Sequence, residues 1–559
     1  MTNANRPFEP AAAKHTPDPA RTQKVLGADV ELGNFVLGMD MPGGTGAAAS
    51  RRLLEEISGV ASGLASVVPT RAYGLPSVTG SAVDPQDRGR RYLPSNSGCA
   101  YIDLDHLELA LPETLSAFDH VAYWRAMLRI ARGAMTTANQ RLPEGCRVQV
   151  LVNCSDGLGN SYGSHANVLL TRAAWDNIFC RKPHFLAYLS AFQISSIVFT
   201  GQGKVGSENG QPPVDYQLSQ RADFIETLVS PQTTVNRPIV NSRDEPLCGP
   251  HSAWQRAPDD VELARLHVIF FDSTLCQIAS LLRAGTLQLV VAMLEAGYVD
   301  PSLAVDDPLD ALHAWSRDPS LRARARMTNG MELTAVDLQL RFLDAAKRFA
   351  AQGGCDGVVP RADEILALWE DTLIKLRGGE FGALSRRLDW VLKLQILRRA
   401  MAQRPELTWA SPQIKHLDQL YASLDAEDGL FWAYEAAGLV DRVVNDEEVE
   451  RAVSDPPENT RAWTRAHLLR RAGADVVEEV DWDLVRIRVV ERRGERRWGA
   501  RKTVRLTKPF GATRADNETI FLGNHTVEDI IEALGSSDDD RPAVYSGLTY
   551  YNHSNYPIS

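Results

Sequence analysis

The sequence has few of the features that mark secreted, membrane-spanning or nucleic-acid-binding proteins. Its seven cysteines form no CxxC pair and no metal-ligand spacing, which argues against a disulfide framework and favours a reducing compartment. It has no run of 18 or more apolar residues, and the N-terminal segment lacks the apolar core of a signal peptide. The net charge of −11 argues against general nucleic-acid binding. We therefore expect a cytoplasmic protein with no membrane segment and no nucleic-acid partner.

The length of 559 residues predicts two or three structural units. Residues 1–23 are rich in Pro, Ala and Asn without a hydrophobic period, and we expect a disordered tail there. Residues 24–474 are expected to form the main domain, with strands first and apolar residues at helical spacing from about residue 272. Residues 475–559 are expected to form a small C-terminal α/β unit. The predicted fold class is therefore α+β.

Local patterning predicts individual elements. Alternation of apolar and polar residues predicts strands over residues 24–40, 99–113, 146–154 and 193–201. Helical spacing predicts helices over 50–65 and 112–141. The first of these helices lies in a long connection, residues 42–97, and connections of such length are usually functional.

Acidic residues gather on two of the predicted strands. Asp29 and Glu31 are two positions apart, so both carboxylates point to one face of a strand. Two neighbouring hard oxygen ligands suit Mg²⁺, although acidic alternation also occurs on plain solvated strands. Residues 101–113 hold five ionisable residues in a largely apolar run, and burying so many is costly unless they meet a metal or each other.

A glycine-rich loop and several arginines supply candidate phosphate ligands. Residues 153–167 place three glycines among hydroxyl and amide residues after a strand, which lets backbone N–H groups approach phosphate closely. Such a loop is also common as a plain connection. Arginine is well suited to bidentate binding of phosphate or carboxylate, and the polar residues of the segment 219–245 include Arg221, Arg237 and Arg243.

Several blocks, in one order, resemble the enzymes that attach or remove the small protein modifier Pup. These blocks are GADVELG (27–33), YIDLDHLE (101–108), DGLGNSYGSHAN (156–167), FTGQGKVG (199–206), YQLSQRADFIETLVSPQTTVNRPIVNSRDEP (216–246) and ARLHV (264–268). The resemblance implies a glutamine-synthetase-like antiparallel sheet packed with helices. It also implies ATP and Mg²⁺ as cofactors for chemistry on a glutamate side chain.

The resemblance assigns roles residue by residue. Asp103 corresponds to the family's catalytic aspartate, which acts as nucleophile or as the base that activates water. The metal ligands implied are Asp29, Glu31, His106 and Glu108. The nucleotide or phosphate contacts implied are His165, Asn167, Arg221, Arg243, Arg265 and His267.

The resemblance leaves the direction of the reaction open. Three features favour an isopeptidase or deamidase that acts on a terminal Gln or Glu of a Pup-like modifier. They are the sequences YQLSQRADFIE and FTGQGKVG and the long connection before Asp103. The segment NSYGSH (160–165) favours the alternative, a ligase. A second alternative is a catalytically weakened binding protein, because the family's glutamates are replaced by Asp29 and Ala166. A small-molecule ligase of the glutamate–cysteine type should lack the 216–246 block.

The C-terminal unit carries a strongly basic predicted hairpin. Residues 485–508 contain ten Arg or Lys against two Glu in an otherwise acidic protein. A solvated strand face accounts for part of this charge. Since Pup-like modifiers are acidic, we expect Arg492, Arg493, Arg496 and Arg497 to attract such a partner.

Overall fold

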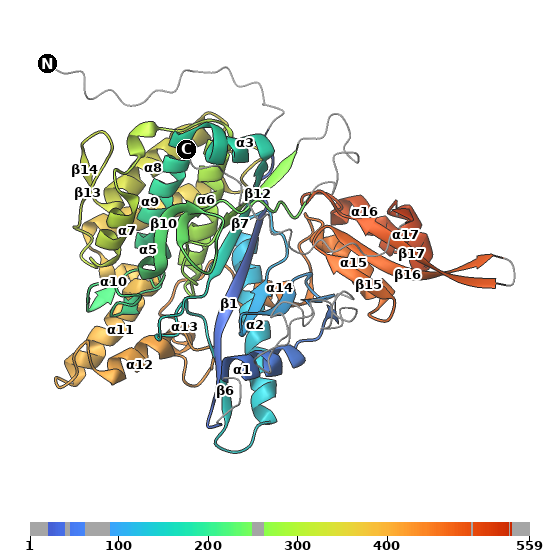
Figure 1. The fold of residues 1–559 in the computed structure, drawn as a ribbon, viewed down its shortest axis with the longest axis horizontal. Coiled ribbons are helices and arrows are strands. Elements are labelled where there is room, and N and C mark those ends of the chain that lie inside the picture. The colour runs from blue at the N-terminus through green and yellow to red at the C-terminus, as the bar shows by residue number, and fades with distance from the viewer. Residues whose placement is uncertain are drawn as a thin grey trace, which may run out of the picture.

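The computed structural model describes residues 21–39, 45–61, 90–248, 262–493, 496–535 and 537–538. At its centre lies an eight-stranded antiparallel sheet in the order β12-β7-β1-β5-β4-β3-β2, with β6 paired to the second half of β1. The strands of this sheet are β1 (Leu26–Leu37), β2 (Val60–Ala61), β3 (Arg91–Tyr92), β4 (Cys99–Asp103), β5 (His106–Ala110), β6 (Arg147–Leu151), β7 (Ser164–Thr171) and β12 (Leu263–Val268). Figure 1 shows these strands between a helical region and a smaller C-terminal unit.

The two faces of the sheet differ in chemistry because side chains alternate along each strand. On β1 the even-numbered residues Leu26, Ala28, Val30 and Leu32 are buried in the main hydrophobic core. The helices α1 (Thr45–Glu55), α2 (Ala117–Gln140) and α6 (Gln277–Glu295) cover this apolar face. The odd-numbered residues of β1 point to the opposite face, which carries the acidic groups.

The helix α6 is the centre of the core. Among the described residues it is the one helix that is long and apolar enough to cross a membrane, yet its entire apolar window is buried inside the protein. It packs against β7 and against helices of the surrounding layer. This environment is that of a core helix.

Helices dominate the chain from α6 to the start of the C-terminal unit, as the sequence predicts. They are α7 (Pro308–Ser316), α8 (Ala335–Ala351), α9 (Ala362–Gly378), α10 (Phe381–Leu384), α11 (Asp389–Gln403), α12 (Pro412–Tyr421), α13 (Leu430–Ala436), α14 (Asp446–Ser454) and α15 (Ala462–Ala472). Short strand pairs border this region, namely β8 (Lys204–Val205) with β9 (Tyr216–Gln217), β10 (Ile225–Ser230) with β11 (Arg237–Asn241), and β13 (Ala325–Arg326) with β14 (Glu332–Leu333). The predicted α+β fold is confirmed.

The C-terminal unit is a small sheet with two helices. Its elements are β15 (Val477–Asp481), β16 (Leu484–Arg493), β17 (Arg496–Arg505), α16 (Arg514–Phe521), α17 (Val527–Ala533) and β18 (Ser537–Asp538). The tip of the β16–β17 hairpin extends away from the body of the protein (Figure 1). The predicted basic hairpin is thus confirmed as paired strands.

The unit does not stand apart from the main sheet. Its hydrophobic cluster includes Leu468 and Leu469 of α15 as well as Tyr92 and Tyr101 of the main sheet. The ring of Tyr92 packs edge-on against Trp482 at 5.4 Å. The C-terminal unit therefore buries one end of the sheet.

Some of the predicted elements are wrong. Residues 193–201 do not form a strand; they complete α4 (Pro183–Ser195) and form α5 (Ile197–Thr200). Polar and apolar residues of this run are all buried, so the run shows no helical period. The segment 99–113 is a hairpin of β4 and β5, and the helix expected over 50–65 is α1, which begins five residues earlier. Residues 62–65 lie outside the described part of the chain.

The predicted tail is also too long. Residues 1–20 lie outside the described part of the chain, but Thr22 is buried and its backbone N–H donates to Glu295 at 3.0 Å. The next ordered contact is a buried ion pair between Lys24 and Glu295. The chain is therefore anchored to α6 before β1 begins.

Candidate active site

The polar face of the sheet gathers acidic side chains from three strands. Glu31 of β1 lies directly opposite Glu108 of β5, and Asp29 lies opposite His165 of β7. Two groups of three side chains could each hold a metal ion: Asp29, Glu108 and His165 form one, and Glu31, Asp103 and Glu108 form the other. Within each group the candidate ligand atoms lie within 4.8 Å of one another. Glu108 belongs to both groups.

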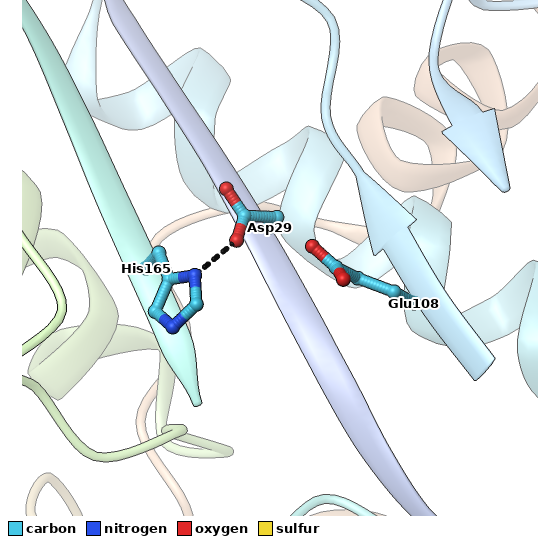
Figure 2. A group of neighbouring side chains, drawn as sticks. All are labelled: Asp29, Glu108 and His165. Atoms are coloured by element: carbon cyan, nitrogen blue, oxygen red, sulfur yellow. Dashed lines mark ion pairs between the residues drawn. The ribbon is translucent and has the colours of Figure 1, made fainter. Parts of the chain in front are cut away.

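Asp29 and His165 form an ion pair at the first group. The Oδ2 atom of Asp29 lies 2.6 Å from Nδ1 of His165, as the dashed line in Figure 2 shows. Burial opposes the charge on Asp29, but the charge and hydrogen bond of His165 outweigh it and hold the pKa of Asp29 well below its usual value. The same contact raises the pKa of His165 against the opposing effect of burial. The contact therefore favours the charged form of both side chains.

Glu108 is a buried carboxyl group surrounded by other carboxylates. It is 3% exposed, and burial together with the charges of Asp29, Glu31 and Asp103 raises its pKa well above the usual value. The hydroxyl of Tyr101 donates to its Oε1 atom. A divalent cation would neutralise this concentration of charge, and carboxylate oxygens are the ligands that Mg²⁺ prefers. The donor set thus fits Mg²⁺.

A glycine brings the loop 153–163 against Glu31. The N–H of Gly163 donates to Oε2 of Glu31 at 2.5 Å, and the N–H of Glu31 donates to the carbonyl of Gly163 at 2.9 Å. A Cβ atom at position 163 would lie 2.3 Å from Nε2 of His165. A glycine is therefore required here so that the loop can close over both residues.

Arg221 contacts this loop beside the acidic groups. Its guanidinium donates to the carbonyl of Tyr162 at 2.5 Å, and its side chain is almost fully buried. Asp272 fixes the segment that carries it by accepting hydrogen bonds from the backbone N–H of Gln220 at 2.8 Å and of Arg221 at 3.2 Å. The sequence analysis missed Asp272, although an acidic residue directly after the apolar run 268–271 is a visible signal.

The other predicted nucleotide contacts surround Asn167. Its Oδ1 atom accepts from Arg265 at 2.8 Å and lies 2.9 Å from Nδ1 of His267. Burial, and then the charge of Arg265, lowers the pKa of His267 well below its usual value, so this imidazole is neutral. The amide of Asn167 also donates to Asp29 at 3.2 Å, which joins this cluster to the first acidic group. Arg243 lies further out, where it pairs with Glu245 at 2.9 Å.

The geometry describes the surroundings of two histidines assigned from the sequence, and both assignments stay predictions. His106 is outside both acidic groups: its Nδ1 lies 2.9 Å from the carbonyl of Leu32 and its ring lies 4.2 Å from that of Tyr162. His165, expected at the nucleotide, lies beside Asp29 in the first group of possible metal ligands. Ala166 is 4% exposed within the apolar core, so its side chain points away from the acidic face.

The four predicted partner-binding arginines lie at the end of the β16–β17 hairpin. Arg492 pairs with Arg497, and Arg493 pairs with Arg496. Their side chains lie outside the described part of the structure. The backbone register nevertheless places four basic residues in two adjacent cross-strand pairs.

Known proteins with similar sequences share one pathway. The sequence model of the Pup-ligase protein family matches residues 60–486. The depupylase of Acidothermus cellulolyticus is 35% identical over 391 residues, which cover 70% of this chain and 74% of the relative. The Pup–protein ligase of Acidimicrobium ferrooxidans is 35% identical over 422 residues, which cover 75% of this chain and 86% of the relative.

Solved structures agree with these matches. The Pup ligase PafA in complex with ADP aligns with a TM-score of 0.65 at 26% identity, over 81% of this chain and 90% of PafA. A complex between Pup and its ligase PafA aligns with a TM-score of 0.71 at 24% identity, over 92% of each chain, which supports the fold. From the family match, the relatives and the acidic face of the sheet, we conclude that the chain belongs to the Pup-ligase family.

Proposed function

We propose that the protein is an ATP- and Mg²⁺-dependent hydrolase that cleaves the amide or isopeptide bond at the terminal Gln or Glu side chain of a small acidic Pup-like modifier. The observation that carries the proposal is the grouping of Asp103 with Glu31 and Glu108 at the end of the polar face. In this grouping, the carboxylate to which we assign the reactive role lies beside ligands that suit a metal ion. The named relatives include a Pup deamidase/depupylase of Mycolicibacterium smegmatis, 35% identical over 418 residues.

We assign the side chains of the site to three roles. Asp29, Glu31, Glu108 and His165 would hold Mg²⁺, and Arg221, Asn167, Arg265 and His267 would bind nucleotide phosphates, with Arg243 at the rim. Asp103 would attack the γ-carbonyl or activate the water that attacks it. When bound, Mg²⁺ would supply electrostatic stabilisation of the developing oxyanion. The ADP complex of a related ligase supports ATP as the nucleotide.

The proposed direction rests on local sequence, because relatives named depupylase and relatives named ligase are equally similar to this chain. The blocks at 199–206 and 216–226 and the long connection before Asp103 favour hydrolysis. A ligase on the same site is the second candidate, and the 35% identical ligase supports it. The alternative of a catalytically weakened binding protein has less support, because the side chain of Ala166 faces the core and not the acidic groups.

Turnover of a modifier that ends in Gln, in the presence of Mg²⁺ and ATP, tests the proposal. Asp103→Asn should lower the rate of ammonia release by about 10²–10⁴-fold, the usual contribution of a positioned acid–base group. Asp105→Asn is the matched control, because it removes the same charge from an exposed position of the same hairpin and Asn tolerates positive φ. Equal rates for Asp103→Asn and the wild type would contradict the proposal. Tight binding of the modifier without turnover would favour the weakened binder.

A further inference from the structure

The hairpin that presents Asp103 has a strained turn. Asp103 pairs directly with His106, so Leu104 and Asp105 form a two-residue loop, and their φ angles are +43° and +71°. This is the pattern of the type I′ turn, which favours Asn-Gly because each central residue needs positive φ. For a residue such as leucine the left-handed region is unfavourable, because Cβ comes too close to the following carbonyl oxygen.

The side chain of Leu104 does little to offset this cost. It is 55% exposed, so little apolar surface is buried in return for the strained backbone. The turn sequence alone therefore does not account for its conformation. Strained residues persist where surrounding structure determines their conformation, and such residues cluster at functional sites.

Asn34 of β1 contacts the turn and the strand that follows it. Its Nδ2 atom donates to the carbonyl of Asp105 at 3.1 Å and to the carbonyl of Gly46 at 2.9 Å. Its Oδ1 atom accepts from the N–H of Leu107 at 2.8 Å. Since Asn34 is only 5% exposed, these bonds are shielded from water. One amide thus links the turn, the strand after it and the start of α1.

The register of this hairpin decides where Asp103 points. A slip by one residue moves a strand side chain to the opposite face of the sheet, and Asp103 is the last residue before the turn. Relaxation of Leu104 to negative φ would break the pairing of Asp103 with His106 and remove Asp103 from Glu31 and Glu108. The strand β1 carries both Glu31 and Asn34. It therefore positions Glu31 directly, and it positions Asp103 through the contacts of Asn34 with the turn.

We infer that Asn34 is a positioning residue that holds the β4–β5 turn in its strained form and thereby keeps Asp103 in reach of the reacting carbonyl. The inference rests on the proposed function for the role of Asp103, but its structural part does not. Nothing else in the proposed chemistry requires Asn34, because its amide groups are occupied by backbone.

Asn34→Ala tests this inference in the full-length protein. We expect kcat to fall about 10–100-fold, the size of effect that a misplacement near 1 Å produces, with little change in the KM for ATP. Hydrogen exchange of the amides of residues 103–107 should become faster. Both changes should be reversed when Leu104→Asn and Asp105→Gly are added, because Asn-Gly forms a type I′ turn without outside support. Leu104→Asn with Asp105→Gly in the wild-type background is the control and should retain activity.

The outcomes separate this inference from the proposed function. If no variant turns over the modifier, but exchange at residues 103–107 rises in Asn34→Ala and is restored by the Asn-Gly turn, the proposed function fails and the structural role of Asn34 stands. The inference is overturned if Asn34→Ala leaves kcat and exchange unchanged. It is equally overturned if the triple variant is as impaired as Asn34→Ala or does not fold, since the role of Asn34 would then not lie in the turn.

Discussion

At the scale of single residues, Glu108 connects the two acidic groups of the site. It faces Glu31 across the sheet, receives a hydrogen bond from Tyr101 and shares a group with Asp29. Without a cation, the charged form of this buried side chain is unfavourable, because burial and the neighbouring carboxylates raise its pKa. The account therefore makes Glu108 and Glu31 the residues on which metal binding depends most.

Glu31→Gln and Glu108→Gln should each weaken Mg²⁺-dependent ATP binding, which calorimetry can measure. Loss of a hydrogen-bond partner of a metal ligand already costs about 10–100-fold in metal affinity, so loss of a ligand should cost at least as much. Glu406→Gln, at an exposed position of the helical region, is the control. Unchanged affinity in both site variants would contradict the metal assignment.

The histidines show what the sequence could predict at this scale. His106 was assigned as a ligand because His106 and Glu108 match the His-x-Glu pair of the family that the 101–108 block resembles. In the structure the site depends on the pairing of β7 with β1, which sets His165 opposite Asp29 across 136 residues of chain. Such a register between distant strands leaves no local signal. The acidic residues were predictable because their strand alternation is local.

At the scale of elements, Glu113 joins the main sheet to α15. Its carboxylate accepts from Arg461 at 2.6 Å and from Arg465 at 2.7 Å, and all three side chains are buried. Burial opposes its charge, but the two guanidinium groups, Arg465 first, lower its pKa to about 2. Arg461 and Arg465 also bind the backbone carbonyls of Leu506 and Trp482.

Glu113→Gln should lower the free energy of unfolding at neutral pH by about 3 kcal/mol, the equivalent of a pKa lowered by roughly 2.5 units. The folded-state pKa lies below the unfolded value, so this stability is present above about pH 4.5 and is lost as pH falls towards 2. Urea unfolding of wild type and variant at pH 7 and at steps below pH 4.5 checks this.

Two features of these unfolding measurements would contradict the role of Glu113. One is a difference between wild type and variant that stays constant as pH falls below 4.5. The other is an effect no larger than that of Glu518→Gln, which removes a more exposed carboxylate from its pair with Arg514.

The hairpin of β4 and β5 shows why some elements were missed. The turn at Leu104 and Asp105 has neither Asn nor Gly, so the local turn signal is absent. The apolar alternation does shift, from even positions at Ile102 and Leu104 to odd positions at Leu107 and Leu109. That change of phase marks a break within an apparently continuous strand. The helix over 193–200 offered no such signal, because it is buried on all sides.

At the scale of the whole molecule, the C-terminal unit supports the site as well as extending from it. Tyr101, which donates to Glu108, belongs to the hydrophobic cluster of this unit. The same unit carries the basic hairpin that extends from the body in Figure 1. Composition predicted the hairpin and its charge, but the shared core depends on contacts between distant segments and was not predictable.

Reversal of Arg492, Arg493, Arg496 and Arg497 to Glu should slow association with an acidic modifier. The effect should be largest at about 0.01 M salt, where the Debye length is roughly 30 Å, and stopped-flow association measurements can follow it. The control reverses four exposed arginines of the helical region, for the same change in net charge: Arg322, Arg324, Arg326 and Arg341. An association rate that responds equally to both sets, or to neither, would contradict a steering role for the hairpin.

The central claim is the direction of the reaction on this site. In the proposed hydrolase the nucleotide would be part of the site and would not be consumed once per product. A ligase must consume one ATP for each bond formed. The most direct test is the number of phosphate ions released per isopeptide bond cleaved or formed, measured with wild-type protein, Mg²⁺, ATP and a Pup-like conjugate. We expect many bonds cleaved for each phosphate released. One phosphate per bond, together with accumulating conjugate, would contradict it and identify a ligase.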